Sequence, residues 1–314
     1  MIQAEGANVS ASASAEANAM KVSGNTVTLN IGGSDGGFPD RILRAINPAW
    51  YERREANALA IKADSVKKTI DTLMEGCPIM TRQRAAMEAM GYRMTNEQAD
   101  NFFEVASRAS DFIENAEHES SPLPPEMRDG IVEGASHAYD EDAKELWSRI
   151  LASEINVPGN FSKRTISILS DMNRSDVLAF KTLCSFSFKN NDDLLPVLES
   201  DLSGYSQNDG ALSIEDTGSL ESLGLVDSTR YMSFNFEASK RYPLLVAGRL
   251  YSVANRKDRA ITVSFPPSFT KYGKELAALC GSEIGTNPKL EEMLRKKFQD
   301  SGLIFEIVPS KDSK

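Results

Sequence analysis

Apolar residues recur every three or four positions along most of this chain, a spacing that places them on one face of an α-helix. The clearest stripes run from Phe102 to Ile113 and from Leu290 to Phe298. Alternating apolar positions, which are typical of strands, occur in the first 37 residues and again in the C-terminal third. The pattern predicts a mainly α protein with a smaller α+β part: a helical N-terminal half, a central helical hairpin and a C-terminal winged-helix-like module.

Residues 1–37 form a separate region, rich in Ala, Ser, Asn and Gly. Val27, Leu29 and Ile31 alternate with polar residues, and Ser23-Gly24-Asn25 suits a hairpin turn between two short strands. One interpretation is a flexible low-complexity tail that ends in the glycine-rich stretch 32–37. The other is a β-hairpin that pairs with strands of another chain.

Residues 38–119 are predicted to be a helical region. Asp40 begins one helix, Pro48 interrupts it, and a long helix from Trp50 to Glu75 ends at Gly76. A second long helix begins at Thr95, where Thr95 and Gln98 have the spacing of a capping box. The proline-rich stretch 120–125 then marks a boundary.

Residues 120–190 form the central helical region. Helices are expected over 126–137, over 141–154 with Asp140 as cap, and over 163–172 with Ser162 as cap; Ser175 is expected to cap one more. Pro158-Gly159 supplies the turn of the central hairpin.

Residues 191–314 read as a mixed α+β module. Strands are expected over 231–236, 244–253, 261–265 and 303–308, with Asn287-Pro288 beginning a last helix. A helix that ends in Leu223-Gly224-Leu225-Val226 before strands is similar to the last helix and wing of a winged-helix module.

Composition removes several classes of protein. The 314 residues carry 35 basic and 45 acidic side chains, a net charge of -10, which excludes a uniformly basic nucleic-acid binder. No run approaches the roughly 18 apolar residues of a transmembrane helix, and the N-terminus lacks the features of a signal peptide. Three widely spaced cysteines without a CxxC pair fit reduced thiols, so a cytoplasmic location is expected.

The charge is unevenly distributed along the chain. From Glu97 to Glu154 there are 15 acidic and 4 basic residues, whereas eight basic residues face only Asp258 in the segment 240–274. The eight are Lys240, Arg241, Arg249, Arg256, Lys257, Arg259, Lys271 and Lys274. This segment suits nucleic acid, with Tyr242, Tyr251 and Tyr272 available for stacking, or an acidic partner, including the acidic region of the same chain or of another copy.

Sequence patterns for catalysis are absent, so the catalytic residues stay unknown. The glycine-rich stretch 32–37 lacks the Lys-Ser/Thr ending of a phosphate loop, and His118 and His137 form no zinc-binding pattern. We therefore expect no cofactor and no metal.

The most distinctive segment runs from Leu146 to Leu169 and contains LWSRILASE, then PGNFSKRT, then Ile168-Leu169. Its marked residues are Trp147, Glu154, Pro158, Gly159, Ser162 and Arg164. With the later Gly273-Lys274-Glu275-Leu276, it resembles an uncharacterised bacterial family, DUF2806, and more distantly the abortive-infection alpha proteins. The resemblance covers about residues 125–280 and implies a role in defence against phage, without an agreed reaction.

Two physical interpretations of this segment stay open. Glu154 and Arg164 flank the Pro-Gly turn, so an ion pair between them would fix the two helices. Alternatively, Ser162 and Arg164 at a helix start would bind a phosphate or a carboxylate.

The sequence thus favours a non-enzymatic bacterial interaction protein, linked to anti-phage defence and acting by self-association and by docking of a partner from the phage or the defence system. One alternative is a winged-helix regulator that binds nucleic acid through the segment 240–274. Another is an enzyme or binder acting on a phosphorylated small molecule at Ser162 and Arg164.

Overall fold

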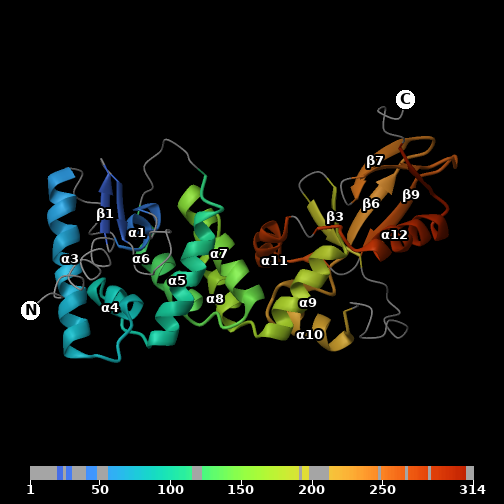
Figure 1. Ribbon diagram of the computed structural model, residues 1–314. Helices are drawn as coiled ribbons and strands as arrows, with labels where there is room; N and C mark the ends of the chain where they lie inside the picture. The colour runs from blue at the N-terminus through green and yellow to red at the C-terminus, as the bar shows by residue number, and fades with distance from the viewer. Residues whose placement is uncertain are drawn as a thin grey trace, which may run out of the picture. The chain divides into compact units, whose positions relative to one another are not determined.

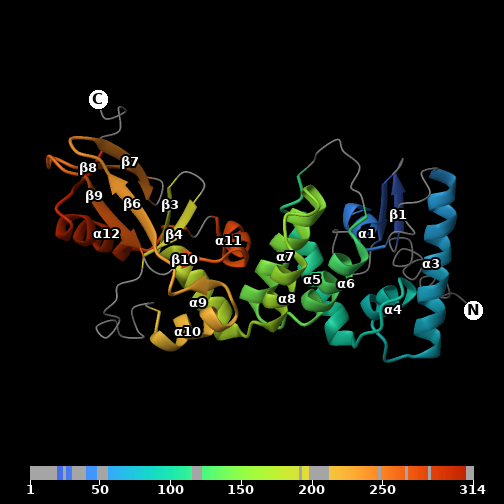
Figure 2. The same cartoon turned by 180° about the vertical axis from the view of Figure 1, so that it is seen from behind.

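The computed structural model describes residues 20–23, 26–29, 40–47, 56–114, 122–190, 193–197, 212–246, 249–265, 268–281 and 284–308. The chain forms two compact units, Met1–Ile166 and Ser167–Lys314 (Figures 1 and 2). The finer boundaries expected after residues 37, 119 and 190 stay predictions. A mainly helical chain with a smaller α+β part is confirmed.

The N-terminal unit begins with an antiparallel hairpin of β1 (Met20–Ser23) and β2 (Thr26–Leu29), in which Ser23 lies opposite Thr26. The predicted hairpin at this position is confirmed, and the rest of the segment 1–37 lies outside the described residues. The hairpin contacts α1 (Asp40–Ile46) and α3 (Ala56–Gly76). Helix α3 ends at Gly76, as the sequence predicts.

The remaining helices of this unit are α4 (Arg82–Ala89), α5 (Asn96–Ser110), α6 (Pro125–Ser136) and α7 (Glu141–Asn156). The predicted caps hold: Thr95 and Gln98 form a capping box, and the Asp140 side chain accepts the Ala143 N–H. Helix α8 (Lys163–Asp171) continues into the second unit. Helix α4 was not expected from the sequence.

The core of the N-terminal unit lies between α5, α6 and α7. Phe102, Ile131, Trp147 and Ile150 are at most 3% exposed there. Trp147 packs directly on Gly134 of α6, where a Cβ atom would lie 2.1 Å from the indole Cζ2 atom. Glycine at this position therefore sets how closely α6 approaches α7.

The C-terminal unit starts with α9 (Arg174–Ser185), whose cap differs from the prediction. Asn173, not Ser175, is the N-cap, because the Asn173 side chain accepts the N–H groups of Ser175 and Asp176. The other helices are α10 (Ile214–Ser222), α11 (Lys271–Ala277), the short 3-10 turn η3 (Ala278–Cys280) and α12 (Pro288–Asp300).

A five-stranded antiparallel sheet has the order β11-β8-β7-β3-β4. Its strands are β3 (Ser187–Asn190), β4 (Asp193–Pro196), β7 (Arg241–Val246), β8 (Arg249–Ala254) and β11 (Ile304–Ile307). The single strand predicted over 244–253 is wrong: β7 and β8 pair with each other, and Val246 lies opposite Arg249. Phe298 and Leu294 of α12 pack with sheet residues in one hydrophobic core.

Two chain segments form a ribbon of paired strands that leads to this sheet. Strand β5 (Val226–Asp227) pairs with β10 (Ser268–Phe269), and further along the same segments β6 (Met232–Phe236) pairs with β9 (Ile261–Phe265). Gly273 of α11 fits against the base of the ribbon, because a Cβ there would lie 2.0 Å from the Leu225 carbonyl oxygen. This contact explains the glycine of the GKEL segment.

Candidate functional site

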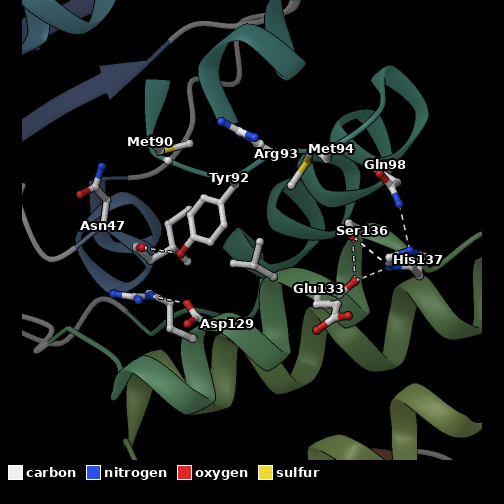
Figure 3. Close-up of a pocket in the computed structure, with 14 residues that line it drawn as sticks. Asn47, Met90, Tyr92, Arg93, Met94, Gln98, Asp129, Glu133, Ser136 and His137 are labelled. Carbon is white, nitrogen blue, oxygen red and sulfur yellow. Dashed lines mark hydrogen bonds and ion pairs between the residues drawn. The ribbon is translucent and has the colours of Figure 1, made fainter. Parts of the chain in front are cut away.

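A cavity of about 560 Å³ opens in the N-terminal unit. Three separate segments line it: the end of α1 with Asn47, the stretch from Met90 to Gln98, and α6 with His137 (Figure 3). The volume lies within the range of about 300 to 1,000 Å³ typical of small-molecule sites. The sequence predicted helices in these segments but did not indicate a binding site there.

Tyr92 is fixed at one end of the cavity. Its hydroxyl donates to the Ile46 carbonyl oxygen over 3.0 Å. Burial raises the pKa of Tyr92 to about 12, against the opposing influence of the nearby Arg128 guanidinium. The phenol is therefore neutral at physiological pH, and its ring is a rigid wall rather than an acid or a base.

Arg128 forms an ion pair with the adjacent Asp129. Its Nε–H donates to Oδ1 of Asp129 over 2.9 Å, and this hydrogen bond is the main cause that raises the pKa of Arg128. The Arg128 side chain is 19% exposed and that of Asp129 59% exposed. The two charges of the pair therefore offset each other at this wall of the cavity.

His137 closes the other end in a defined tautomer. Its Nδ1 lies 2.9 Å from the Glu133 carbonyl oxygen, which can only accept, so Nδ1 carries the proton. Its Nε2 lies 2.9 Å from Nε2 of Gln98, whose Oε1 already accepts the Thr95 N–H. The Gln98 amide therefore donates to Nε2 of His137, and the capping box of α5 fixes the direction of that amide.

Two charged side chains of the lining, Arg93 and Glu133, are exposed. Within the described part of the chain, no ion pair or hydrogen bond of the Arg93 guanidinium or the Glu133 carboxylate is found. They come from opposite walls, Arg93 from the α4–α5 connection and Glu133 from α6 (Figure 3). The four-residue spacing of Asp129, Glu133 and His137 was the one sequence signal for this wall.

The marked residues of the segment 146–169 lie outside this lining. Glu154 is 0% exposed and accepts the N–H groups of Gly159 (2.9 Å) and Phe161 (2.7 Å). Arg164 is exposed at the surface. The predicted Glu154–Arg164 ion pair is therefore wrong: the carboxylate binds the backbone of the turn, where Pro158 precedes Gly159, whose φ is +92°.

Ser162 has a local role at the start of α8. Its hydroxyl accepts the Thr165 N–H over 3.2 Å and lies 2.7 Å from the Thr165 hydroxyl. These contacts are those of a helix cap, as the sequence predicts. Binding of an anion by Ser162 and Arg164 stays a prediction.

The eight basic residues of the segment 240–274 are all exposed, but the fold separates them. Arg249 is the first residue of β8, where its positive charge helps to lower the pKa of Glu291. Lys271 and Lys274 lie on α11. Lys240 pairs with Glu237. Tyr251 is buried and donates to Glu291 over 2.8 Å, so its predicted stacking role is wrong.

Asn255 brings the others together at one end of the sheet. Its N–H donates to the Lys240 carbonyl oxygen (3.0 Å), its side-chain amide donates to the Arg259 carbonyl oxygen (2.9 Å), and its Oδ1 accepts the Lys257 N–H (2.9 Å). Four cationic side chains gathered here make no ion pair with any described residue, and we call them the basic surface: Arg241, Arg256, Lys257 and Arg259.

Two further findings bear on chemistry. In the described segments, no group of three or more His, Cys, Asp and Glu side chains is arranged to hold a metal ion. Among the described helices, none combines the length and apolar character needed to cross a membrane.

Comparison with known proteins gives one match. Residues 83–288, more than half of the chain, match the family described as "Protein of unknown function (DUF2806)". Neither curated proteins nor solved structures give a match. The matched range includes both the α5–α6 walls of the cavity and the basic surface. The chain belongs to the DUF2806 family.

Proposed function

We propose that this chain is a non-enzymatic interaction protein that assembles by charge complementarity. The basic surface of one copy docks on an acidic surface, in the first place the helices α5–α7 of another copy. The observation that carries the proposal is that Arg241, Arg256, Lys257 and Arg259 are exposed and unpaired among the described residues, and that Asn255 hydrogen-bonds the backbone of the turn that bears the last three. A turn whose backbone is already fixed need not be ordered when a partner binds.

The acidic surface has a matching surplus. Each of the four basic residues of the region 97–154 already pairs within the N-terminal unit, for example Lys144 with Glu104 over 2.6 Å. Glu97 and Asp100, three residues apart on α5, and Asp111, the residue that follows the helix three turns further on, are exposed on one side of it. That face therefore presents net negative charge to a partner.

Nucleic acid is the weaker candidate for the basic surface. In a winged-helix protein, the helix before the wing enters the major groove. Here that helix would be α10, which carries Glu215, Asp216 and Glu221 and no Lys or Arg. Three carboxylates would repel phosphates, so the winged-helix likeness does not favour groove reading.

Sedimentation velocity at low and high ionic strength tests the proposal. We expect full-length protein to associate at low salt and to dissociate at high salt. Arg256→Gln with Arg259→Gln should weaken association about tenfold, since two charge contacts of ~0.7 kcal/mol each sum to ~1.4 kcal/mol. The matched control, Lys271→Gln with Lys274→Gln, removes two charges from α11 and should change little. A version starting at Phe38 shows separately what the N-terminal hairpin contributes.

A monomer at all salt concentrations would refute self-association. Salt-dependent binding of a labelled oligonucleotide that the Arg256/Arg259 variant loses would replace the proposal by the nucleic-acid alternative.

We also propose that the assembly serves defence against phage, as the similarity of the segment 146–169 to abortive-infection alpha proteins suggests. Phage plating on cells that express the protein tests this. We expect fewer plaques with the intact protein than with the Arg256/Arg259 variant, and equal plating would count against a defence role.

A further inference from the structure

We propose that the cavity of the N-terminal unit binds a small zwitterion of the amino-acid type with an apolar side chain. Binding of this ligand is separate from the proposed charge-driven docking, because the cavity lies in the N-terminal unit and the basic surface in the C-terminal unit.

The charge pattern of the cavity selects a ligand that carries both signs. Arg93 and Glu133 come from opposite walls, and among the described residues neither charge has an ion-pair partner (Figure 3). A carboxylate on the ligand would accept from the Arg93 guanidinium, and an ammonium group would donate to Glu133. Such charge-assisted hydrogen bonds are about twice as strong as neutral ones.

The other polar groups of the lining have their charge neutralised or absent. Arg128 is bound to Asp129 over 2.9 Å, Tyr92 is a neutral phenol held by Ile46, and both ring nitrogens of His137 have hydrogen-bond partners in Glu133 and Gln98. A simple anion would therefore meet the unpaired Glu133 carboxylate in the same cavity, and a simple cation would meet Arg93. A zwitterion satisfies both charges.

Part of the lining suits an apolar group. Met90 and Met94 are half-buried and contribute hydrophobic surface, and the buried Ile46 and Val132 lie among the lining residues. Methionine side chains adapt to ligands of varied shape, and the fixed Tyr92 ring offers a flat face beside them. An aliphatic, thioether or aromatic side chain fits this surface better than a charged one.

Thermal stabilisation of the full-length protein by each standard L-amino acid is the first measurement. We expect apolar amino acids, such as L-phenylalanine or L-methionine, to raise the melting temperature most. Calorimetric titration then compares the best amino acid with its N-acetyl derivative, which lacks the ammonium charge, and with its amide, which lacks the carboxylate. Each derivative should bind at least about tenfold more weakly.

Two variants test which charged group of the ligand binds Arg93 and which binds Glu133. Arg93→Gln should bind the amino acid and its amide equally, and Glu133→Gln should bind the amino acid and its N-acetyl derivative equally. Both side chains are exposed, so unchanged circular dichroism should accompany these losses. Glu75→Gln removes an exposed carboxylate from the last turn of α3, outside the lining, and should bind as the wild type does.

Three results would overturn the proposal: no amino acid stabilises the protein, the uncharged derivatives bind as well as the amino acid, or the two variants leave the discrimination intact. None of these bears on the salt-dependent association, so the two proposals fail separately.

Discussion

Replacing Gly134 by alanine should destabilise the N-terminal unit, although alanine is the better helix former. A Cβ at this position would lie 2.1 Å from Cζ2 and 2.2 Å from Cη2 of Trp147. The indole is 3% exposed and surrounded by protein, so it has no free space into which to turn. Helices α6 and α7 must move apart, or the ring must leave its rotamer.

The magnitude follows from two opposing effects. Glycine-to-alanine substitution inside a helix stabilises by up to ~1 kcal/mol. Overpacking of a filled core costs ~1 to 3 kcal/mol, and an approach far below van der Waals contact puts this site at the upper end. We therefore expect a net loss of about 2 kcal/mol in the free energy of unfolding.

Urea unfolding followed by tryptophan fluorescence measures this loss, since Trp50 and Trp147, the two tryptophans of the chain, belong to the N-terminal unit. Gly130→Ala is the matched control one helical turn away. Its Cβ would lie 3.1 Å from Cγ2 of the buried Ile166, a contact that a shift of a few tenths of an ångström relieves, so its stability should stay within ~1 kcal/mol of the wild type. Stability of Gly134→Ala equal to that of Gly130→Ala would refute the packing argument.

Other predictions concern buried contacts in both units. Glu154→Gln should cost ~2 to 3 kcal/mol in urea unfolding, because an amide cannot accept on both sides where the carboxylate accepts two N–H groups. Partial burial, which raises the pKa of Glu104, is outweighed by hydrogen bonds from Lys144 and Arg108, so the folded pKa lies below the ordinary 4.5. This stabilisation is present at neutral pH and is lost as the pH falls below about 4.5 through the folded pKa; unfolding of Glu104→Gln should therefore depend less on pH in that range than unfolding of the wild type. Gly273→Ala should destabilise the C-terminal unit in thermal unfolding, because its Cβ would lie 2.0 Å from a backbone oxygen, whereas Gly218→Ala, with open space, should not.

Much of the helical architecture could be predicted from the sequence because its signals are local. Thr95 and Asp140 cap helices through side chains that reach three residues ahead, and Gly76 ends α3. The β7–β8 hairpin was missed because its apolar run continues across both strands, with only Ala247-Gly248 between them. Such a run is as typical of one buried strand as of two paired ones.

The candidate sites depend on contacts between distant segments, which one sequence does not reveal. Asn47, Arg93 and Glu133 line one cavity, although each is about forty or more positions from the next along the chain. The excess of basic residues over 240–274 was visible, but their pairing was not. Only the fold shows that Arg249 lies near Glu291 while Arg256 stays unpaired among the described residues.

The residues that carry the family resemblance hold the fold together. Glu154 binds the turn that follows its helix, Trp147 packs on Gly134, and Gly273 passes close to a backbone carbonyl. None of them lines the cavity or belongs to the basic surface. The Glu154 carboxylate is fully buried, and it satisfies the backbone N–H groups of the turn. The proposals of function therefore rest on the exposed charges: Arg93 and Glu133 in one unit, and the basic surface in the other.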